Sequence, residues 1–351
     1  MADIASAPDA GGQRAWWWTE YAQRSMGGHL GIRVTWPEKI SKSQDDLATR
    51  LLRDVASRVD RWAAMMTRHH ASQLTRINAE PGTKVRVGPT LAAVLSWSAD
   101  AWSMTDGLIN IAMLDERIAA EEGRPVRGQS LSRDWQLQLD HWTHEAHAHI
   151  RGGWLTRPDG LQLDLDGVGK GWIADRAATL LMRLLDAHAS MRRLPGWHSC
   201  FVDADGDIAI RNRRGADTLI RIEVPGGSDP TIGTIRVSGA EAGVATSGTG
   251  IHAWGGRHHI IDPRTGRSAN SGIAQATVVM TSTREAEAWA KAIVIDGARM
   301  IQRAEIAGVH RVVAVEVGGG IISAPAFQRA DAPHQYLPST DTAAAPEMSR
   351  Q

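Results

Sequence analysis

The chain has 351 residues, of which 42% are apolar and 22% are charged, a composition typical of one large globular domain or two closely packed lobes. Its 39 Lys and Arg residues balance 39 Asp and Glu residues, so no overall field attracts nucleic acid or an acidic membrane. The single cysteine, Cys200, excludes a disulfide within the chain and a cluster of thiolates around a metal.

Both ends of the sequence are rich in small and polar residues. Such segments bury too little apolar surface to fold, so we predict a disordered arm over residues 1–14 and a disordered tail over residues 328–351. Residues 15–327 are then the folded domain. The start of the sequence shows neither a basic leader nor an apolar signal core, and no apolar stretch reaches the length of a membrane span. A cytoplasmic location is therefore expected.

In chain order, the first predicted elements are a strand over residues 31–36, from alternating polarity, and a helix over residues 45–66, from an apolar stripe. Pro89 marks the start of another helix, and residues 171–186 form a third. No clean period covers residues 115–162, where we expect irregular surface structure and a short strand pair.

The second half of the chain is richer in strands. Apolar and β-branched runs predict strands over residues 200–203, 208–211, 219–224, 234–237, 274–280 and 312–317. Helices are predicted over residues 284–295 and 298–306. Because helices and hairpin-like strands are mixed without regular βαβ alternation, the pattern favours an α+β fold with mixed or antiparallel sheets flanked by helices.

A glycine-rich loop over residues 163–171 lies between a strand-like run and the helix predicted from Gly171. Glycines let a backbone approach a ligand closely, and the free N–H groups of a helix N-terminus suit phosphate. Lys170 could add a positive charge there. The spacing of a Walker A loop is absent. These residues alone fit a plain strand-to-helix turn and a phosphate site equally well.

Two further clusters contain polar groups that could line a site. Residues 243–248 place Thr246, Ser247 and Gly248 after an apolar approach, and by themselves they favour a polar turn with capping hydroxyls. Residues 258–266 hold two adjacent histidines and then a tight turn. On a strand the two histidines point to opposite faces, so one can face a site as a base for a hydroxyl proton. Either could instead be a satisfied surface or core side chain.

Glu287 and Lys291 stand four residues apart on one face of the helix predicted over residues 284–295. They could form an ordinary surface ion pair. The small alanines around them instead favour close packing, in which a carboxylate could be an oxygen ligand for Mg²⁺. The residues alone leave both interpretations open.

The order and spacing of these clusters resemble the ApbE family of FAD:protein FMN transferases, from about Met26 to Ile322. Each motif is weak alone, and the combination indicates the family. The motifs are Met-Gly-Gly at 26–28, Ser-Gln-Leu-Thr-Arg-Ile-Asn at 72–78, Thr-Asp-Gly-Leu-Ile-Asn at 105–110, the glycine-rich loop with Asp175 after it, Asp-Ala-Asp-Gly-Asp at 203–207, Thr-Ser-Gly at 246–248 and the run over 259–266.

The resemblance implies an ApbE-like, T-fold-related domain with its active site in a cleft between two lobes. It also implies an Mg²⁺-dependent enzyme that cleaves FAD, attaches FMN through a phosphoester to a threonine of an acceptor protein, and releases AMP. By position, the catalytic residues would be His259, Asp262 and Thr265, and the metal would bind the Gly169 carbonyl, Glu287 and Lys291. The residues around FAD would be Met26, Asn78, Asp106, Asp164, Gly167, Val168, Lys170, Asp175, Thr246, Ser247, Gly248 and His259.

Several residues depart from the family pattern. Glu287 replaces a typical Asp, and Lys291 replaces a Thr that commonly supplies a metal oxygen. An ammonium group cannot ligate Mg²⁺, so Lys291 could instead contact a phosphate or pair with Glu287. Two other functions stay open: hydrolysis of FAD to FMN and AMP, and flavin binding without turnover. The remaining departures are Asn110 for Asp, Asp166 and Asp205 for glycines, and Asp203 for Asn.

Overall fold

The computed structural model describes residues 17–125, 138–140, 153–213, 216–223, 231–250, 252–325 and 334–338. The predicted arm over residues 1–14 and most of the predicted tail over 328–351 lie outside these ranges. Within that tail, the structure differs from the prediction: His334–Pro338 is a strand, β18, that pairs with β9 (Thr231–Ser238). Backbone pairing to the edge of a sheet holds this segment, and composition alone does not reveal such pairing.

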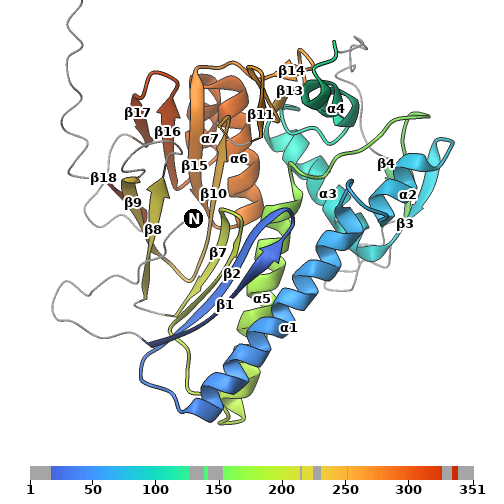
Figure 1. Cartoon of the computed structure of the whole chain (residues 1–351). Helices are drawn as coiled ribbons and strands as arrows, with labels where there is room; N and C mark the ends of the chain where they lie inside the picture. Colours follow the sequence, from blue (N-terminus) through green and yellow to red (C-terminus); the bar gives the residue numbers. More distant parts are fainter. Residues whose placement is uncertain are drawn as a thin grey trace, which may run out of the picture.

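An eight-stranded sheet forms the centre of the molecule, and all its neighbouring strands run antiparallel (Figure 1). The strand order is β1-β2-β6-β7-β10-β15-β16-β17. Its strands are β1 (Trp17–Ser25), β2 (Gly28–Trp36), β6 (Ser199–Ala204), β7 (Asp207–Asn212), β10 (Glu241–Gly248), β15 (Ile273–Met280), β16 (Arg311–Glu316) and β17 (Ile321–Ala324).

Three long helices pack on one face of this sheet: α1 (Lys42–Met66), α5 (Gly169–Ser190) and α6 (Thr283–Asp296). The opposite face carries a three-stranded sheet in the order β18-β9-β8, where β8 is Asp217–Glu223. Successive side chains along a strand point to opposite faces of the sheet, so one strand can contribute to the cores on both sides. On β6, Val202 joins the core under the helices, whereas its neighbour Phe201 joins the core under the small sheet.

The remaining elements lie around one end of the helices (Figure 1). A second three-stranded sheet has the order β3-β5-β4, and two short hairpins, β11-β12 and β13-β14, follow β10. The elements are α2 (Gln73–Ala79), β3 (Lys84–Val87), α3 (Pro89–Met104), α4 (Leu114–Glu122), β4 (Gln138–Asp140), β5 (Gly153–Thr156), β11 (Ala253–Trp254), β12 (Arg257–His258), β13 (Ile261–Asp262), β14 (Arg267–Ser268) and α7 (Ala298–Ile306).

The structure confirms the predicted α+β class, and the predicted helices and strands appear with boundaries that agree to within a few residues. Residues 243–248 are a correction, because they form β10 in the middle of the large sheet and are no turn. Their small and hydroxyl side chains let α6 lie close to the strand, so that a Cβ on Gly243 would meet the backbone N of Thr283 at 2.1 Å. In residues 115–162 the strand pair is present, but α4 was missed; residues 126–137 and 141–152 lie outside the described part.

Candidate active site

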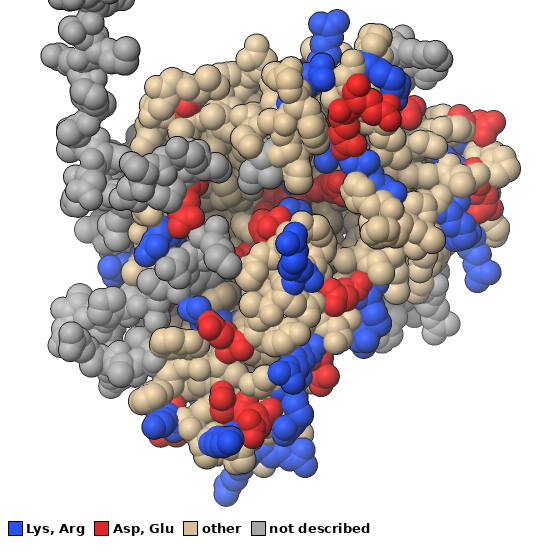
Figure 2. All heavy atoms as spheres, viewed as in Figure 1, with Lys and Arg blue, Asp and Glu red and all other residues tan. Residues whose placement is uncertain are grey.

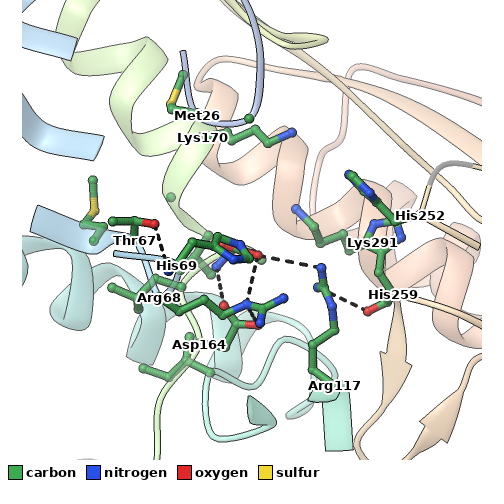
Figure 3. Close-up of a pocket in the computed structure, with 18 of the residues that line it drawn as sticks. Met26, Thr67, Arg68, His69, Arg117, Asp164, Lys170, His252, His259 and Lys291 are labelled. Atoms are coloured by element: carbon green, nitrogen blue, oxygen red, sulfur yellow. Dashed lines mark hydrogen bonds and ion pairs between the residues drawn. The ribbon is translucent and has the colours of Figure 1, made fainter. Parts of the chain in front are cut away.

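A pocket of about 820 Å³ opens where the N-terminus of α5, the C-terminal end of α1 and the segment after β10 meet. This volume lies within the roughly 300–1,000 Å³ of small-molecule and cofactor sites. Figure 2 shows a hollow on this face of the molecule with acidic and basic side chains in its wall, and Figure 3 shows the pocket from close by. Eight of the residues predicted from the sequence line it: Met26, Asp164, Gly167, Val168, Gly169, Lys170, His259 and Lys291.

The glycine-rich loop forms one wall of the pocket and leads directly into α5. Helix α5 begins at Gly169, two residues before the predicted start, and its N-cap residue Val168 provides no side-chain hydrogen bond. The start of the helix lies beside the pocket, where the backbone N–H groups of a helix N-terminus can bind an anion if they have no other partner. Two of these N–H groups are already used: that of Gly169 donates to the Leu165 carbonyl oxygen at 2.9 Å, and that of Gly171 donates to Oε2 of Glu287 at 3.0 Å.

Gly171 is required by the close packing of α5 on α6. A Cβ at this position would lie 2.8 Å from both the Cα of Arg284 and the carbonyl oxygen of Thr283. The adjoining Gly169 has open space instead. The contact at Gly171 brings the start of α5 next to Glu287, and so it joins two clusters that lie far apart in the sequence.

Lys170 extends into the pocket, and its Nζ lies 2.9 Å from Oδ2 of Asp205. Burial favours the neutral amine, but the negative charges of Asp207 and Asp205 outweigh it and raise the pKa of Lys170. Burial likewise opposes ionisation of Asp205, and the nearby ammonium outweighs it, so the pKa of Asp205 is lowered. The pair is therefore charged at neutral pH. Asp205 replaces a family glycine and occupies a donor of Lys170 that could otherwise contact a ligand.

Glu287 and Lys291 form an ion pair at the pocket wall, with 2.6 Å between Nζ and Oε1. The Glu287 side chain is 1% exposed and that of Lys291 is 15% exposed, so this is not an ordinary surface pair. Asp207 lies nearby in the buried interior, where burial and the charge of Glu287 raise its pKa well above the usual carboxyl range. Two lysines and two buried acids thus meet beside the glycine-rich loop.

These residues do not fit the metal site that the resemblance implies. Both carboxylate oxygens of Glu287 are already engaged, one by the Lys291 ammonium and one by the Gly171 N–H. A cation at the same place would be repelled by the ammonium, which has no lone pair to offer it. Within the described residues, no group of three or more His, Cys, Asp or Glu side chains is arranged to hold a metal ion.

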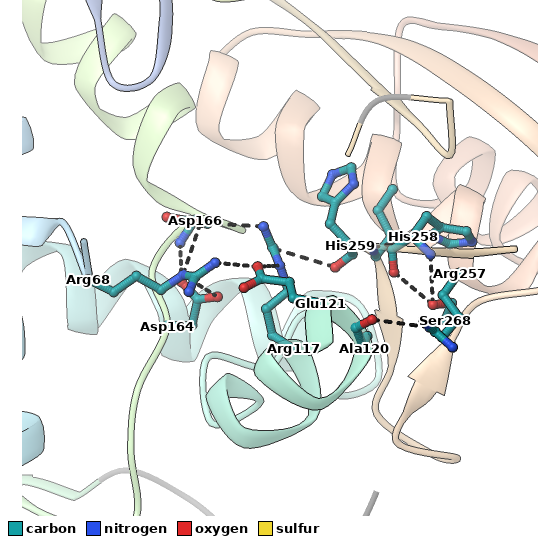
Figure 4. Close-up of polar contacts among 11 residues, drawn as sticks. Arg68, Arg117, Ala120, Glu121, Asp164, Asp166, Arg257, His258, His259 and Ser268 are labelled. Carbon is teal, nitrogen blue, oxygen red and sulfur yellow. Dashed lines mark hydrogen bonds and ion pairs between the residues drawn. The ribbon is translucent and has the colours of Figure 1, made fainter. Parts of the chain in front are cut away.

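A network of charged side chains holds the opposite wall of the pocket (Figure 4). Arg68 and Arg117 both bind Glu121, and both also reach Asp166, each at 3.7 Å. In addition, Nε of Arg68 lies 3.9 Å from Oδ2 of Asp164. Burial, and then the charge of Asp166, raises the pKa of Asp164 to about 6 despite these arginines. The network ties the end of α1 and α4 to the glycine-rich loop.

His259 lines the pocket, whereas His258 is buried. The predicted alternation along a strand is not the cause, because β12 ends at His258 and His259 lies just beyond it. The His258 ring lies 2.9 Å from the Ala269 carbonyl oxygen, and burial lowers its pKa. The ring of His259 meets that of His252 edge-on, with 5.4 Å between centroids. The backbone carbonyl of His259 accepts from Arg117 at 3.5 Å, which connects the histidine to the charged network (Figures 3 and 4).

Some predicted site residues lie outside the pocket lining and support it from behind. Asn78 holds the loop by two hydrogen bonds to the backbone of Leu163. Asp175 accepts from the N–H groups of Thr283 and Arg284 at the start of α6, and burial raises its pKa although these bonds oppose the shift. Both residues therefore position elements that carry pocket side chains.

Other predicted residues lie further from the pocket. Asp106 is on the surface and pairs with Arg299 and Arg303 of α7. Asp262 and Thr265 form the predicted tight turn between β13 and β14, and Asp262 binds Arg264. On β10, Thr246 bonds to Thr277 of β15, Ser247 is buried, and Gly248 is the last residue of the strand.

The pocket lining also includes residues that were not singled out from the sequence, among them Arg68, Arg117, Asp207 and His252. Asp207 is the last residue of the Asp-Ala-Asp-Gly-Asp motif at 203–207, so the sequence could have indicated it as a site residue. Arg68 lies two residues after the end of α1 and Arg117 lies in α4, and no local pattern marked either as a site residue. His252 has a φ of 51°, which no local pattern predicts.

The fold and the pocket define a class of protein: an α+β protein built on a large antiparallel sheet, with a helix N-terminus, lysines and a histidine facing one pocket. The model of the ApbE family matches residues 26–310 of this chain. The chain belongs to the ApbE family.

Relatives and solved structures agree with this assignment. The chain is 31% identical over 159 residues to an FAD:protein FMN transferase of Vibrio cholerae, which covers 43% of this chain and 44% of that protein. It is 25% identical over 225 residues to one from Escherichia coli (strain K12), which covers 60% of each. The matched part thus spans between 44% and 60% of the length of these relatives.

Two crystal structures show the same fold. The apo form of the flavinyl transferase ApbE of Pseudomonas stutzeri superposes with a TM-score of 0.64 at 19% identity, covering 88% of this chain and 94% of that one. The ApbE protein of Thermotoga maritima gives 0.67 at 20% identity, covering 87% and 96%. Within the described residues, no helix is long and apolar enough to cross a membrane.

Proposed function

We propose that this chain cleaves FAD, transfers the FMN half to a threonine hydroxyl of an acceptor protein, and releases AMP. The observation that carries the proposal is the pocket, which combines the N-terminus of α5, two lysine ammonium groups and His259 around one space. A pyrophosphate needs positive charge and N–H donors, and a hydroxyl nucleophile needs a base. Membership of the ApbE family, and relatives named FAD:protein FMN transferase, support the same activity.

In the proposed reaction, the threonine oxygen forms a bond to the phosphorus of the FMN half. The bond from that phosphorus to the oxygen bridging to AMP breaks, and AMP leaves with that oxygen. The hydroxyl proton passes to His259 and then to solvent or the leaving phosphate. Because bonds are exchanged at one phosphorus, catalysis rests on positioning and on neutralising charge.

The pocket offers separate regions for the parts of FAD. Lys170, Lys291 and the first turn of α5 would bind the pyrophosphate. Apolar side chains would cover the aromatic rings, since ligand pockets are mostly apolar with a few placed polar groups. These apolar lining residues are Leu108, Ile109, Ile111, Met113, Ile173, Ile260, Ile261 and Ile295.

The test is incubation of the purified chain with FAD and a protein extract of the source cells, with and without Mg²⁺, followed by mass spectrometry and chromatography. Transfer predicts AMP together with threonine peptides that have gained FMN less one water. Release of FMN and AMP without a modified peptide would show a hydrolase instead. Binding of FAD without AMP in any sample would show a flavin-binding protein and contradict the proposal.

A further inference from the structure

The ion pair between Glu287 and Lys291 is built into the pocket and is not an incidental surface contact. The two residues are one helical turn apart on α6, and the Glu287 carboxylate is held from both sides, by Lys291 Nζ at 2.6 Å and by the Gly171 N–H at 3.0 Å. An exposed pair of this spacing stabilises a helix only weakly and is easily lost. Here the carboxylate is buried, so the ammonium has a fixed partner that defines its place.

That place lies beside the proposed pyrophosphate region. Lys291 lines the pocket, and its Cδ would lie 4.0 Å from a Cβ on Gly167, so the side chain passes along the glycine-rich loop. Lys170 enters the same pocket from the start of α5. Figure 3 shows both side chains extending into the pocket.

The charges around Lys291 explain why an ammonium group can reside there. Glu287 and Asp207 are buried acids that interact with each other and with both lysines. A buried carboxylate without a partner is strongly unfavourable, so this corner of the pocket requires a cation. Here the cation is the ammonium group of Lys291, which is part of the protein itself. It keeps N–H donors that Glu287 does not use, and phosphate oxygens accept such donors.

We propose that the Lys291 ammonium, held in place by Glu287, takes over the role of a divalent cation at the pyrophosphate, so that this chain binds and cleaves FAD without a divalent metal. The inference rests on the proposed function for its substrate. Its core, metal-free recognition of a pyrophosphate, is testable without any transfer activity.

The first experiment uses the wild-type chain, freed of metal with EDTA. Calorimetric titration with FAD and with inorganic pyrophosphate is carried out in EDTA and in millimolar Mg²⁺, and AMP release is followed in both. We expect dissociation constants and AMP yield to agree between the two conditions within about threefold, about 0.65 kcal/mol. Binding or cleavage that appears only with Mg²⁺ would overturn the inference.

The second experiment uses variants to test whether the Lys291 ammonium is the group that replaces the metal ion. Lys291→Met should weaken pyrophosphate binding in EDTA by about 10- to 100-fold, the range of a charged hydrogen bond, whereas Lys291→Arg should retain most of it. Lys291→Thr should also fail in EDTA, but Mg²⁺ should restore it, because a hydroxyl oxygen beside a freed carboxylate can bind the metal. Lys42→Met, at an exposed position on α1, is the matched control. Unchanged metal-free binding by Lys291→Met would contradict the inference.

Removing the ammonium leaves Glu287 unpaired, and a single variant could unfold for that reason. Glu287→Gln combined with Lys291→Met removes both charges and keeps the volume, so it serves as a folded test of the same site. Failure of the two proposals is distinguishable. Metal-free binding of FAD without any AMP in either condition would overturn the proposed function and metal-free cleavage, but not metal-free recognition of the pyrophosphate. Transfer that strictly requires Mg²⁺ would overturn the inference alone, and no binding in either condition would overturn both.

Discussion

The side-chain amide of Asn78 makes two hydrogen bonds with the backbone of Leu163: Nδ2 donates to the carbonyl at 2.8 Å, and Oδ1 accepts from the N–H at 2.9 Å. The pair joins the end of α2 to the strand-like run before the glycine-rich loop. Asn78 therefore acts on the pocket through the loop, although it does not line the pocket itself.

Asn78→Ala should lower the free energy of unfolding by about 1–3 kcal/mol, because it leaves two backbone groups of a part-buried residue without partners. The loop would also lose its anchor, so FAD affinity should fall. Urea denaturation and calorimetric titration measure the two effects. Asn270→Ala, at an exposed position, is the matched control. Equal stability of the two variants would contradict a role for the amide pair.

His259→Ala should leave FAD affinity within about tenfold and lower the rate of AMP release by about 10²-fold or more, because the threonine proton loses its acceptor. The control is His188→Ala, which lies near the far end of α5, about 28 Å along the helix from Gly169. Single-turnover chromatography gives the rate, and titration gives the affinity. An unchanged rate would remove His259 from the reaction.

Asp164 should make the stability of the protein depend on pH in a defined direction. Its pKa is raised to about 6 by burial and by Asp166, whereas an unfolded aspartate has a pKa of about 3.9. Between these values the folded state holds a proton that the unfolded state has lost. The free energy of unfolding therefore falls as pH rises through about 4 to 6, and the contribution is complete below that window and absent above it.

Asp164→Asn removes this titration and keeps an oxygen for the N–H of Asp166, which now donates to Oδ1 at 3.0 Å. The stability of the variant minus that of the wild type should increase by about 1–3 kcal/mol between pH 4 and pH 7. Urea denaturation at several pH values checks this. A difference that stays constant over the window would show that Asp164 does not titrate there.

Gly171→Ala should lower the free energy of unfolding by about 1–3 kcal/mol, because the added methyl group meets the backbone of α6 at 2.8 Å. Gly169→Ala, in the same helical turn, meets no atom within 4 Å and should be neutral or stabilising by up to about 1 kcal/mol. Thermal and urea unfolding compare the two. If both variants lose the same stability, the close approach of α5 and α6 is not the cause.

Local patterns in the sequence predicted much of the fold. The apolar stripe of α1, the proline that begins α3 and the tight turn between β13 and β14 depend on short-range sterics and periodicity, which neighbouring residues encode. The glycine-rich loop was predicted for the same reason. That one of the two adjacent histidines can face a site was also predicted, although His259 lies just beyond β12 and not on a strand. Residues 243–248 misled the prediction, because hydroxyls and glycines favour turns locally, whereas here they let a helix pack onto a central strand.

By itself, the sequence determined the α+β class, the resemblance to the ApbE family and the presence of a lysine where a metal ligand was expected. Only the tertiary structure decided which charges meet. Gly171 and Glu287 are 116 positions apart, yet the Gly171 N–H engages one carboxylate oxygen of Glu287 while Lys291 engages the other. Arg68, just after α1, and Arg117, in α4, likewise reach the loop from separate parts of the chain. Local patterns report whether a side chain is buried, but its partners depend on how distant elements pack, and those partners decide what the pocket can bind.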